Sequence, residues 1–460
     1  MNSKTIEFFK EIAKIPRESG AELQIAKYLC EFAVKRNLEY CCDDFNNVVI
    51  KKKNADKEPI ILQAHTDMVC EKEKDLEFDF SKDEIQIKSD GKYLKSKGTT
   101  LGADNGIGIA QILNILDSNI PCNVEAVFTV AEETDMAGAM NFDVSKLKGK
   151  WLISLDGFEE NTIITESACF YDIILSKKYR FHSINENVFL INLSGLLGGH
   201  SGLDIDLNRG NANILLANLL REIGNVSICD FTGGTKFNVI PSDAKCEFAS
   251  KRALSELEEI CIDFENNWKS EFKQLNISIE HVHKNKYLYN ALSEEDSISF
   301  LNTLLNFKHG VVYYNKAKEV TTSVNLGAVD LKSGCMKVGM RSSKQKEEKL
   351  ILKQLKEYSK ENNLDFKIFS AQPSFESSPE SKLIKMLINT SPIGLFGTKT
   401  GLKSVHFAVE LGLFKEKMPW LDIAIISPNI QNAHTVNECV EIESIYRTDK
   451  WLCNFLNELT

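Results

Sequence analysis

Short apolar runs that lead into ionisable side chains are the feature that most constrains how this chain folds. The runs lie at 60–62, 124–130, 151–155 and 423–426. The ionisable residues that follow them are His65, Glu132, Glu133, Asp156 and His434. Runs of this kind are typical of buried strands, and stretches with helical spacing lie between them at 5–34 and 107–116. The alternation predicts an α/β fold, with a mainly parallel sheet flanked by helices.

The ionisable residues at the ends of these runs are expected to meet. In an open α/β sheet the carboxyl ends of parallel strands share one edge, where ligands bind. Asp104 joins the set because it follows a glycine-rich turn and precedes an amphipathic stretch. Taken singly, His65 reads as a surface histidine and Asp156 as a helix cap. Together, two imidazoles and three carboxylates suit two zinc ions, with one carboxylate bridging them.

The adjacent residues Glu132 and Glu133 are predicted to have different roles. Two neighbouring carboxylates after a buried strand repel each other, and a cation would relieve that repulsion. A metal-activated water also needs a proton acceptor that later protonates the leaving amine. One glutamate should therefore be the base and the other a ligand, and the spacing alone leaves open which is which. Asp67, two residues past His65, is placed to orient the imidazole ring.

The middle of the chain has a different character and predicts a second domain. With 460 residues the chain exceeds what one core usually serves. From about 171 to 369 no ligand-like cluster occurs apart from His200, and the strand and helix patterns are those of an α+β domain. The expected division is a catalytic domain formed by 1–169 and 374–460, interrupted by an inserted domain at 170–373.

Charge and hydropathy exclude several classes of function. Lys and Arg number 55 against 65 for Asp and Glu, a net charge of −10, and no basic run suggests a nucleic acid partner. No segment approaches the roughly 20 apolar residues that span a bilayer, and the first residues do not resemble a signal peptide. Twelve scattered cysteines form no CxxC pair, as expected for reduced thiols. These features predict a cytoplasmic protein that does not bind membranes.

Several longer strings occur in the order known from one enzyme family. They are IPRESG at 15–20, QAHTDMV at 63–69, GTTLGADNGIG at 98–108, AEET at 131–134, GGHSG at 198–202, NVIP at 238–241 and NAHT at 432–435. Through these strings the sequence resembles the aminoacyl-histidine dipeptidases, also called Xaa-His or cytosol non-specific dipeptidases, of the zinc-dependent exopeptidase clan. The resemblance covers nearly the whole chain.

The resemblance implies a role for each residue of the metal site. Two Zn²⁺ ions would be held, one by His65 and Asp156, the other by Glu133 and His434, with Asp104 bridging; Mn²⁺ or Co²⁺ are possible substitutes. Glu132 would be the general base and Asp67 would support His65. The implied activity is hydrolysis of dipeptides, either Xaa-His or of broad specificity.

The resemblance also implies how substrate and partner subunit are bound. The inserted domain would be a lid and a homodimerisation domain, and His200 would polarise the scissile carbonyl, in its own subunit or in the partner. Arg341 and Asn238 would hold the substrate carboxylate, and Glu410 the free ammonium. From the residues alone, His200 is equally readable as a turn residue and Arg341 as a surface charge.

Two other functions fit the same metal site. Aminoacylases, deacetylases and carboxypeptidases of the clan differ mainly in how they bind the two ends of the substrate. A metal-binding dimeric scaffold without turnover is the less favoured reading, since no ligand and no general base is missing. The chain departs from the family pattern where Phe407 and Ala408 replace smaller residues, at Asp135 and at Gly157. These changes affect pocket shape and remove no ligand.

Overall fold

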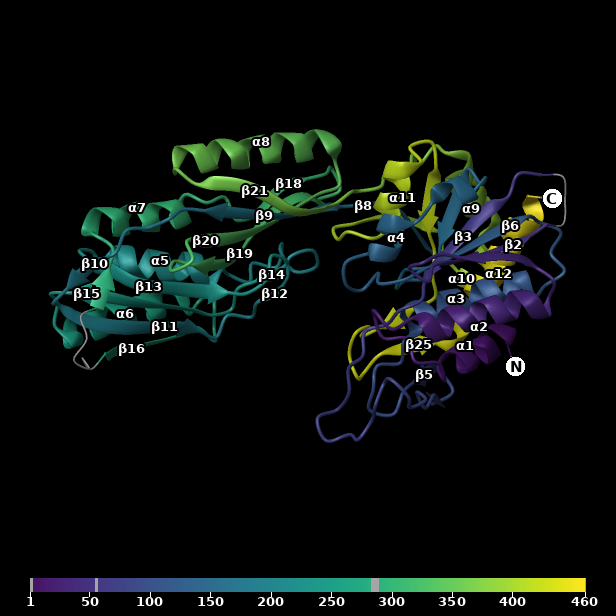
Figure 1. Cartoon of the computed structure of the whole chain (residues 1–460), viewed down its shortest axis with the longest axis horizontal. Coiled ribbons are helices and arrows are strands. Elements are labelled where there is room, and N and C mark those ends of the chain that lie inside the picture. The colour runs from purple at the N-terminus through teal and green to yellow at the C-terminus, as the bar shows by residue number, and fades with distance from the viewer. Residues whose placement is uncertain (1–2, 54–56, 283–288, 460) are drawn as a thin grey trace. The chain divides into compact units, whose positions relative to one another are not determined.

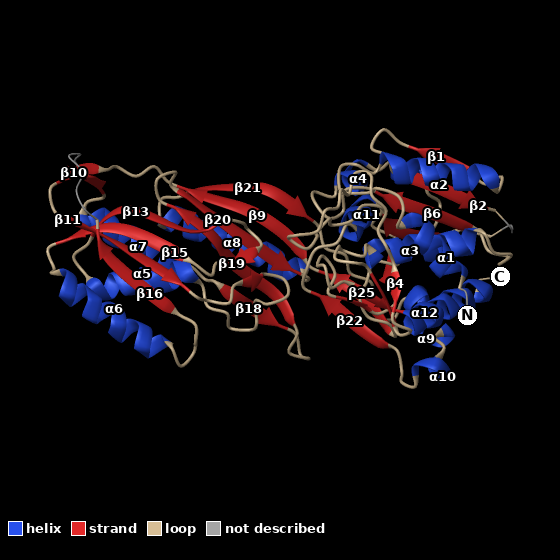
Figure 2. Cartoon of the chain, turned by 90° about the horizontal axis from the view of Figure 1, so that it is seen from below, coloured by secondary structure: helices blue, strands red, loops and turns tan. Residues whose placement is uncertain are grey.

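The computed structural model describes residues 3–53, 57–282 and 289–459, and it divides into two compact units (Figure 1). Unit 1 comprises Met1–Ser167, Pro373–Val405 and Val409–Thr460, and unit 2 comprises Ala168–Gln372 with His406–Ala408. Unit 2 is therefore inserted into unit 1 along the chain. Figure 2 distinguishes helices, strands and loops in both units.

The sheet of unit 1 has eight strands and is parallel at its centre. Its order is β1 (Glu39–Cys42), β2 (Val48–Lys52), β6 (Val124–Thr129), β3 (Ile60–His65), β7 (Trp151–Ser154), β23 (Asp422–Ile425), β8 (Thr162–Ser167) and β22 (Gly401–Val405). The pairs β6–β3, β3–β7, β7–β23 and β8–β22 are parallel. The predicted α/β class is confirmed, and β3 and β6 are buried throughout, as expected of strands covered on both faces.

Helices pack on this sheet through apolar faces. The longer ones are α1 (Lys4–Ile12), α2 (Leu23–Lys35), α3 (Ala103–Leu116), α9 (Lys382–Thr390) and α12 (Ile442–Glu458). In α12 the buried positions 445, 448, 452, 455 and 456 follow helical spacing and join the core of the sheet. The shorter ones are α4 (Ala137–Asn141), η1 (Val144–Lys146), α10 (Ile393–Phe396) and α11 (Leu411–Lys417).

A small four-stranded sheet completes unit 1. It contains β24 (Ile430–Gln431), β25 (Cys439–Glu441), β5 (Tyr93–Lys95) and β4 (Lys88–Ser89) in that order. The loop between β24 and β25 carries His434, so this sheet fixes both ends of the segment that bears the last predicted ligand.

Unit 2 is built on an antiparallel sheet. The strand order is β16 (Asn276–His281), β11 (Asn187–Ser194), β15 (Ala244–Ser250), β13 (Ser227–Gly234), β19 (Val320–Asp330), β20 (Cys335–Ser342), β9 (Cys169–Ser176) and β21 (Asp365–Gln372), with β18 (Gly310–Tyr314) on β19. The helices are α5 (Ala212–Ile223), α6 (Leu254–Trp268), α7 (Glu294–Leu305) and α8 (Gln345–Glu361). Two further strand pairs are β10 (His182–Ile184) with β17 (Tyr289–Ala291), and β12 (Gly199–His200) with β14 (Val239–Ile240).

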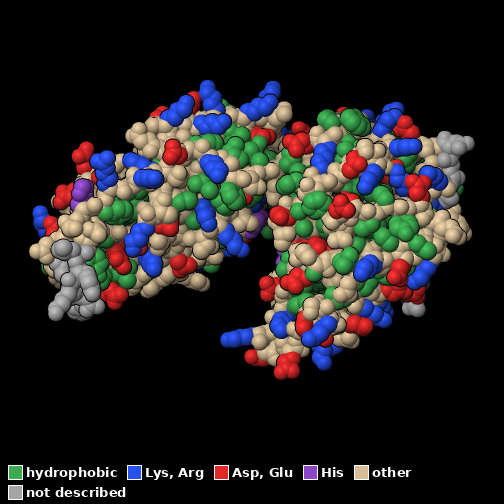
Figure 3. All heavy atoms as spheres, viewed as in Figure 1, with side chains coloured by type: hydrophobic (Ala, Val, Ile, Leu, Met, Phe, Trp, Pro, Cys, Tyr) green, Lys and Arg blue, Asp and Glu red, His purple; other side chains and the backbone are tan. Residues whose placement is uncertain are grey.

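Charged side chains of both signs are mixed over the surface. On the face drawn in Figure 3, Lys and Arg alternate with Asp and Glu and do not gather into one extended basic area. Within the described residues, no helix combines the length and the apolar character needed to cross a membrane.

Candidate metal centre

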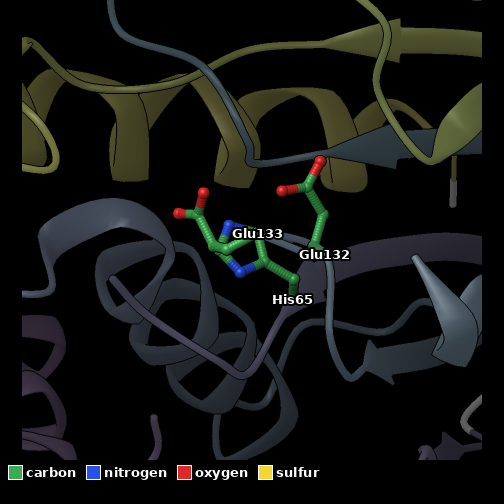
Figure 4. A group of neighbouring side chains, drawn as sticks. All are labelled: His65, Glu132 and Glu133. Atoms are coloured by element: carbon green, nitrogen blue, oxygen red, sulfur yellow. The ribbon is translucent and has the colours of Figure 1, made fainter. Parts of the chain in front are cut away.

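The sheet of unit 1 brings the predicted ligands to one edge. His65 is the last residue of β3, Glu132 and Glu133 follow β6, and Asp156 follows β7. Because β3 runs parallel to both β6 and β7, these three strand ends lie next to one another. Figure 4 shows His65, Glu132 and Glu133 close together, with the two glutamate carboxylates pointing apart.

Among the described residues, three groups bring potential ligand atoms within 4.8 Å of one another. Two of these groups share one carboxylate: His65, Asp104 and Asp156 form the first, and Asp104, Glu133 and His434 form the second. The third group consists of His65, Glu132 and Glu133. Asp104 Oδ1 is 3.2 Å from His65 Nε2, and Asp104 Oδ2 is 3.1 Å from His434 Nε2. Each oxygen of Asp104 thus faces a different imidazole, which is the arrangement a bridging carboxylate requires.

The charges of the site fit a pair of divalent cations. Burial is the largest cause that raises the pKa of Glu132, Glu133 and Asp156 above their ordinary values, and neighbouring carboxylates add to it. Concentrating carboxylates in a buried place is unfavourable unless a cation offsets their charge. The donor set of imidazoles and carboxylates is the one that zinc accepts. The residues present therefore fit such ions.

Asp67 ties the two predicted ligand loops together. Its Oδ1 is 3.3 Å from His65 Nδ1, and its oxygens accept backbone hydrogen bonds from Glu132 (3.0 Å) and Glu133 (3.1 Å). Ser19 Oγ donates a further hydrogen bond of 2.7 Å. Burial opposes ionisation of Asp67, but the His65 ring and these donors outweigh it and lower the pKa to about 2. One carboxylate thus orients both the His65 ring and the Glu132–Glu133 turn.

The predicted ligands differ in how far they are exposed. The side chain of His434 is 45% exposed, whereas that of His65 is 1% exposed. His434 Nε2 lies 2.8 Å from Glu133 Oε1, so the group that contains these two residues also contains the most exposed ligand candidate.

Glu410 lies beneath the same strand ends. Its Oε1 accepts hydrogen bonds from Thr129 Oγ1 (2.6 Å) and from Gln63 Nε2. The residue has no exposed surface, and burial raises its pKa to about 8. A direct contact between Glu410 and a substrate ammonium, which the family resemblance predicts, would therefore require the surrounding residues to move.

The remaining predicted site residues lie together in unit 2. Arg341, on β20, is 3% exposed, donates to Ser201 Oγ at 3.2 Å and lies 3.3 Å from His200 Nε2. Its guanidinium is stacked 4.1 Å from the ring centre of Phe170. Asn238 precedes β14, which pairs with the strand of His200, and its carbonyl accepts from the Ser201 amide. Across 3–53, 57–282 and 289–459, no carboxylate forms a salt bridge with Arg341.

His406 belongs to this unit 2 cluster, although its sequence pattern did not single it out. His406 Nε2 is 2.8 Å from Ser323 Oγ. Burial, followed by the positive charges of Arg341 and His200, lowers the pKa of His406 to about 3. A Cβ on Gly202 would lie 2.8 Å from the His406 carbonyl and 3.0 Å from the His200 ring, so the glycine permits their close packing. The feature that could have drawn attention to His406 is its place in the segment 404–410, of which residues 406–408 belong to unit 2 and the others to unit 1.

The chain as a whole is similar to known peptidases. The sequence profile of Peptidase family M20/M25/M40 matches residues 61–458. A cytosol non-specific dipeptidase of Escherichia coli (strain K12) is 30% identical over 473 aligned residues, covering 98% of this chain and 97% of the relative. The crystal structure of an aminoacylhistidine dipeptidase from Vibrio alginolyticus superimposes with a TM-score of 0.85 at 27% identity, over 99% of this chain and 96% of that one. An aminopeptidase PepT from Bacillus cereus shares the fold, with a TM-score of 0.58 at 14% identity over 99% and 98% of the two chains.

Proposed function

Because the chain belongs to peptidase family M20/M25/M40 and is a peptide-bond hydrolase, we propose that it is a two-metal dipeptidase. The observation that carries this proposal is the pair of ligand groups that share Asp104. The substrate class is taken from the two relatives, one named a non-specific and the other an aminoacylhistidine dipeptidase. The proposed substrates are accordingly dipeptides, with either Xaa-His or broad preference.

In this proposal each ligand group holds one ion, zinc by preference and manganese or cobalt as substitutes. His65 and Asp156 would hold the first ion, Glu133 and His434 would hold the second, and Asp104 is the carboxylate that both groups share. When bound, such ions would acidify a water molecule and polarise the peptide carbonyl. The assignment of Glu133 as ligand is supported by its 2.8 Å approach to His434.

The protein's own groups then move the proton. Glu132, unlike Glu133, makes no contact with His434. It accepts the proton of the attacking water at a carboxylate oxygen and transfers it to the leaving amine. Burial and the charge of Asp156 raise the pKa of Glu132, which favours a carboxyl that can both take up and release a proton. Asp67 keeps the His65 ring oriented and fixes the backbone of Glu132.

Unit 2 is proposed to recognise the substrate. The guanidinium of Arg341 is buried and forms no salt bridge with a carboxylate among the described residues. The α-carboxylate of a dipeptide would therefore supply the missing salt bridge. Asn238 would assist it, and His200 would donate to the scissile carbonyl oxygen as that oxygen gains negative charge. Unit 2 would also act as the lid and as the contact of a homodimer, and either subunit could supply His200. A cytoplasmic location follows from the same proposal.

Glu410 is proposed to bind the substrate ammonium. Its carboxylate is fully buried, so this contact requires movement of Gln63 and Thr129, which hold it.

The test is hydrolysis of Ala-His, Cys-Gly, a tripeptide and N-acetyl-Ala-His by metal-loaded protein, before and after treatment with a chelator. We expect chelator-sensitive cleavage that is confined to dipeptides with a free amine. Cleavage of the acetylated peptide would move the assignment to the aminoacylase, deacetylase or carboxypeptidase branch of the clan. No cleavage by protein with two metals bound would favour the scaffold function.

A further inference from the structure

Two buried charges outside the ligand set lie beside the metal centre. Arg17, in the segment between α1 and α2, and Glu438, in the loop that also carries His434, are each 2% exposed. Within the described part of the chain, neither residue forms a direct salt bridge. Burying a charge is unfavourable unless hydrogen bonds or an opposite charge offset it, so the partners of these two side chains are informative.

Arg17 joins the His65 loop to the Asp104 loop. Its Nη1 donates to the carbonyl of Thr66 at 3.1 Å and to that of Asp67 at 2.9 Å. Its Nη2 donates to the carbonyl of Gly102. These carbonyls belong to residues directly after His65 and two residues before Asp104, so one guanidinium sets the spacing of both loops.

Glu438 holds the same Asp104 loop from its amide side. Its Oε2 accepts from the backbone N–H of Leu101 (2.8 Å) and Gly102 (2.9 Å), and its Oε1 accepts from the N–H of Asp104 (3.2 Å). Glu438 lies four residues past His434, in a turn closed by its own N–H and the Thr435 carbonyl. The carboxylate therefore connects the His434 loop to the Asp104 loop.

The backbone groups of Gly102 are therefore held by two side chains of opposite charge. Its carbonyl faces the guanidinium of Arg17 and its N–H faces the carboxylate of Glu438. A Cβ on Gly102 would lie 2.4 Å from Arg17 Nη2, and one on Gly106 would lie 2.8 Å from the same atom. Gly102 also has φ +67°, which favours glycine. Both glycines are thus needed for the guanidinium to reach its place.

We propose that Arg17 and Glu438 are positioning residues of the metal centre: between them they fix the Leu101–Asp104 loop so that the Asp104 carboxylate lies between His65 and His434. The proposal rests on the proposed function, because it assumes that Asp104 bridges two metal ions. Neither residue touches the ions or the substrate. Their effect is exerted through the backbone, by setting how far apart the three ligand loops lie.

The test uses conservative variants and the full-length protein. In Glu438→Gln one oxygen becomes an amide group, which faces backbone N–H donors and cannot accept from them. In Arg17→Lys the charge is kept, but a single ammonium cannot reach the carbonyls of both loops. For each variant, the Kd for Zn²⁺ and for Mn²⁺ is measured by competition with a chelator, and the Tm of the metal-free protein is measured separately.

The matched control is Asp449→Asn. Asp449, on α12, accepts three hydrogen bonds, as Glu438 does, but from the side chains of Ser3, Thr5 and Gln111, which lie outside the ligand loops. We expect Glu438→Gln and Arg17→Lys to weaken metal binding by about 10- to 100-fold, while their metal-free Tm falls no further than that of Asp449→Asn. At saturating metal we expect the loss to appear in kcat and to leave KM nearly unchanged.

Unchanged metal affinity together with a lowered Tm in both variants would overturn the proposal, because it would show a role in folding alone. A loss of metal affinity of the same size in Asp449→Asn would overturn it too. If the wild-type protein binds two metals but cleaves no dipeptide, the proposed function fails while the metal measurements still decide the role of Arg17 and Glu438. If the wild-type protein binds no metal, both fail.

Discussion

The two units concentrate opposite kinds of charge. In unit 1 the carboxylates of Asp104, Glu132, Glu133 and Asp156 gather around two imidazoles, and burial raises the pKa of three of them. In unit 2 the guanidinium of Arg341 lies near the imidazoles of His200 and His406, and burial lowers the pKa of that guanidinium to about 10. A cation would complete the first cluster and an anion the second. The contrast teaches that the buried charges of the two units favour ligands of opposite sign.

The strongest way to sharpen this contrast is to separate ligand from base within unit 1. We expect Glu132→Gln to retain both metals and to lose about 10²- to 10⁴-fold in kcat, the usual contribution of a general base. We expect Glu133→Gln to lose one metal, because its carboxylate contacts His434. Metal content by atomic emission and single-turnover rates check both. Equal metal loss in the two variants would contradict the division of roles.

A smaller effect is expected from the cationic cluster of unit 2. Arg341→Lys keeps the charge but loses the planar fork and the stacking on Phe170, so we expect kcat/KM to fall roughly 10- to 100-fold, mostly through KM. Metal affinity should not change, because Arg341 belongs to neither ligand group. Steady-state kinetics and a metal titration provide the measurements. An altered metal affinity would break the distinction between the two units.

A third pair of effects concerns pH and stability, and they run in opposite directions in the two units. Burial raises the pKa of Glu410 in unit 1 to about 8 and lowers that of His309 in unit 2 to about 4. The unfolded chain ionises Glu410 near 4.5, so the free energy of unfolding should fall as pH rises from 4.5 to 8. The unfolded chain protonates His309 near pH 6.5, so the free energy of unfolding should also fall as pH drops from 6.5 to 4.

One pKa unit corresponds to about 1.4 kcal/mol, so the contribution is at most about 5 kcal/mol for Glu410 and at most about 3 kcal/mol for His309. Glu410→Gln retains the oxygen that accepts from Thr129, and it should remove the decline on the alkaline side in the metal-free protein. His309→Gln should remove the decline on the acidic side. Urea unfolding of each variant between pH 4 and 8 checks this. Parallel pH profiles for wild type and both variants would contradict the assignment.

The sequence predicted which candidate site residues lie together, but not the contacts that hold them in place. His65, Glu132, Glu133 and Asp156 follow apolar runs, and such runs reveal where strands end. The partners of Glu438 lie more than 330 residues away in the chain, so no local pattern reports that its carboxylate is buried and bonded to Leu101 and Asp104. Arg17 is likewise part of a string that was recognised, IPRESG, yet its buried position depends on two distant glycines.

The inserted α+β unit was also predicted from a change in pattern, but the course of the chain around 406–408 was not. These residues join unit 2, although the segments on both sides of them belong to unit 1. A segment of three residues is too short to show a helical or strand-like pattern of apolar residues. Only the hydrogen bond of His406 to Ser323 and its packing beside Gly202 reveal it.

The order of the strands has a consequence for how the protein is made. Strand β7 pairs with β23, and Asp104 meets His434 across 330 residues of sequence. At the usual 5–20 residues per second, a ribosome needs roughly 15–65 s to synthesise that interval. During this time the nascent first half carries an open sheet edge while the whole of unit 2 emerges and folds. The group of potential ligands that contains His434 is therefore completed only in the last stage of synthesis, and a chain truncated before β23 would expose β7 to aggregation.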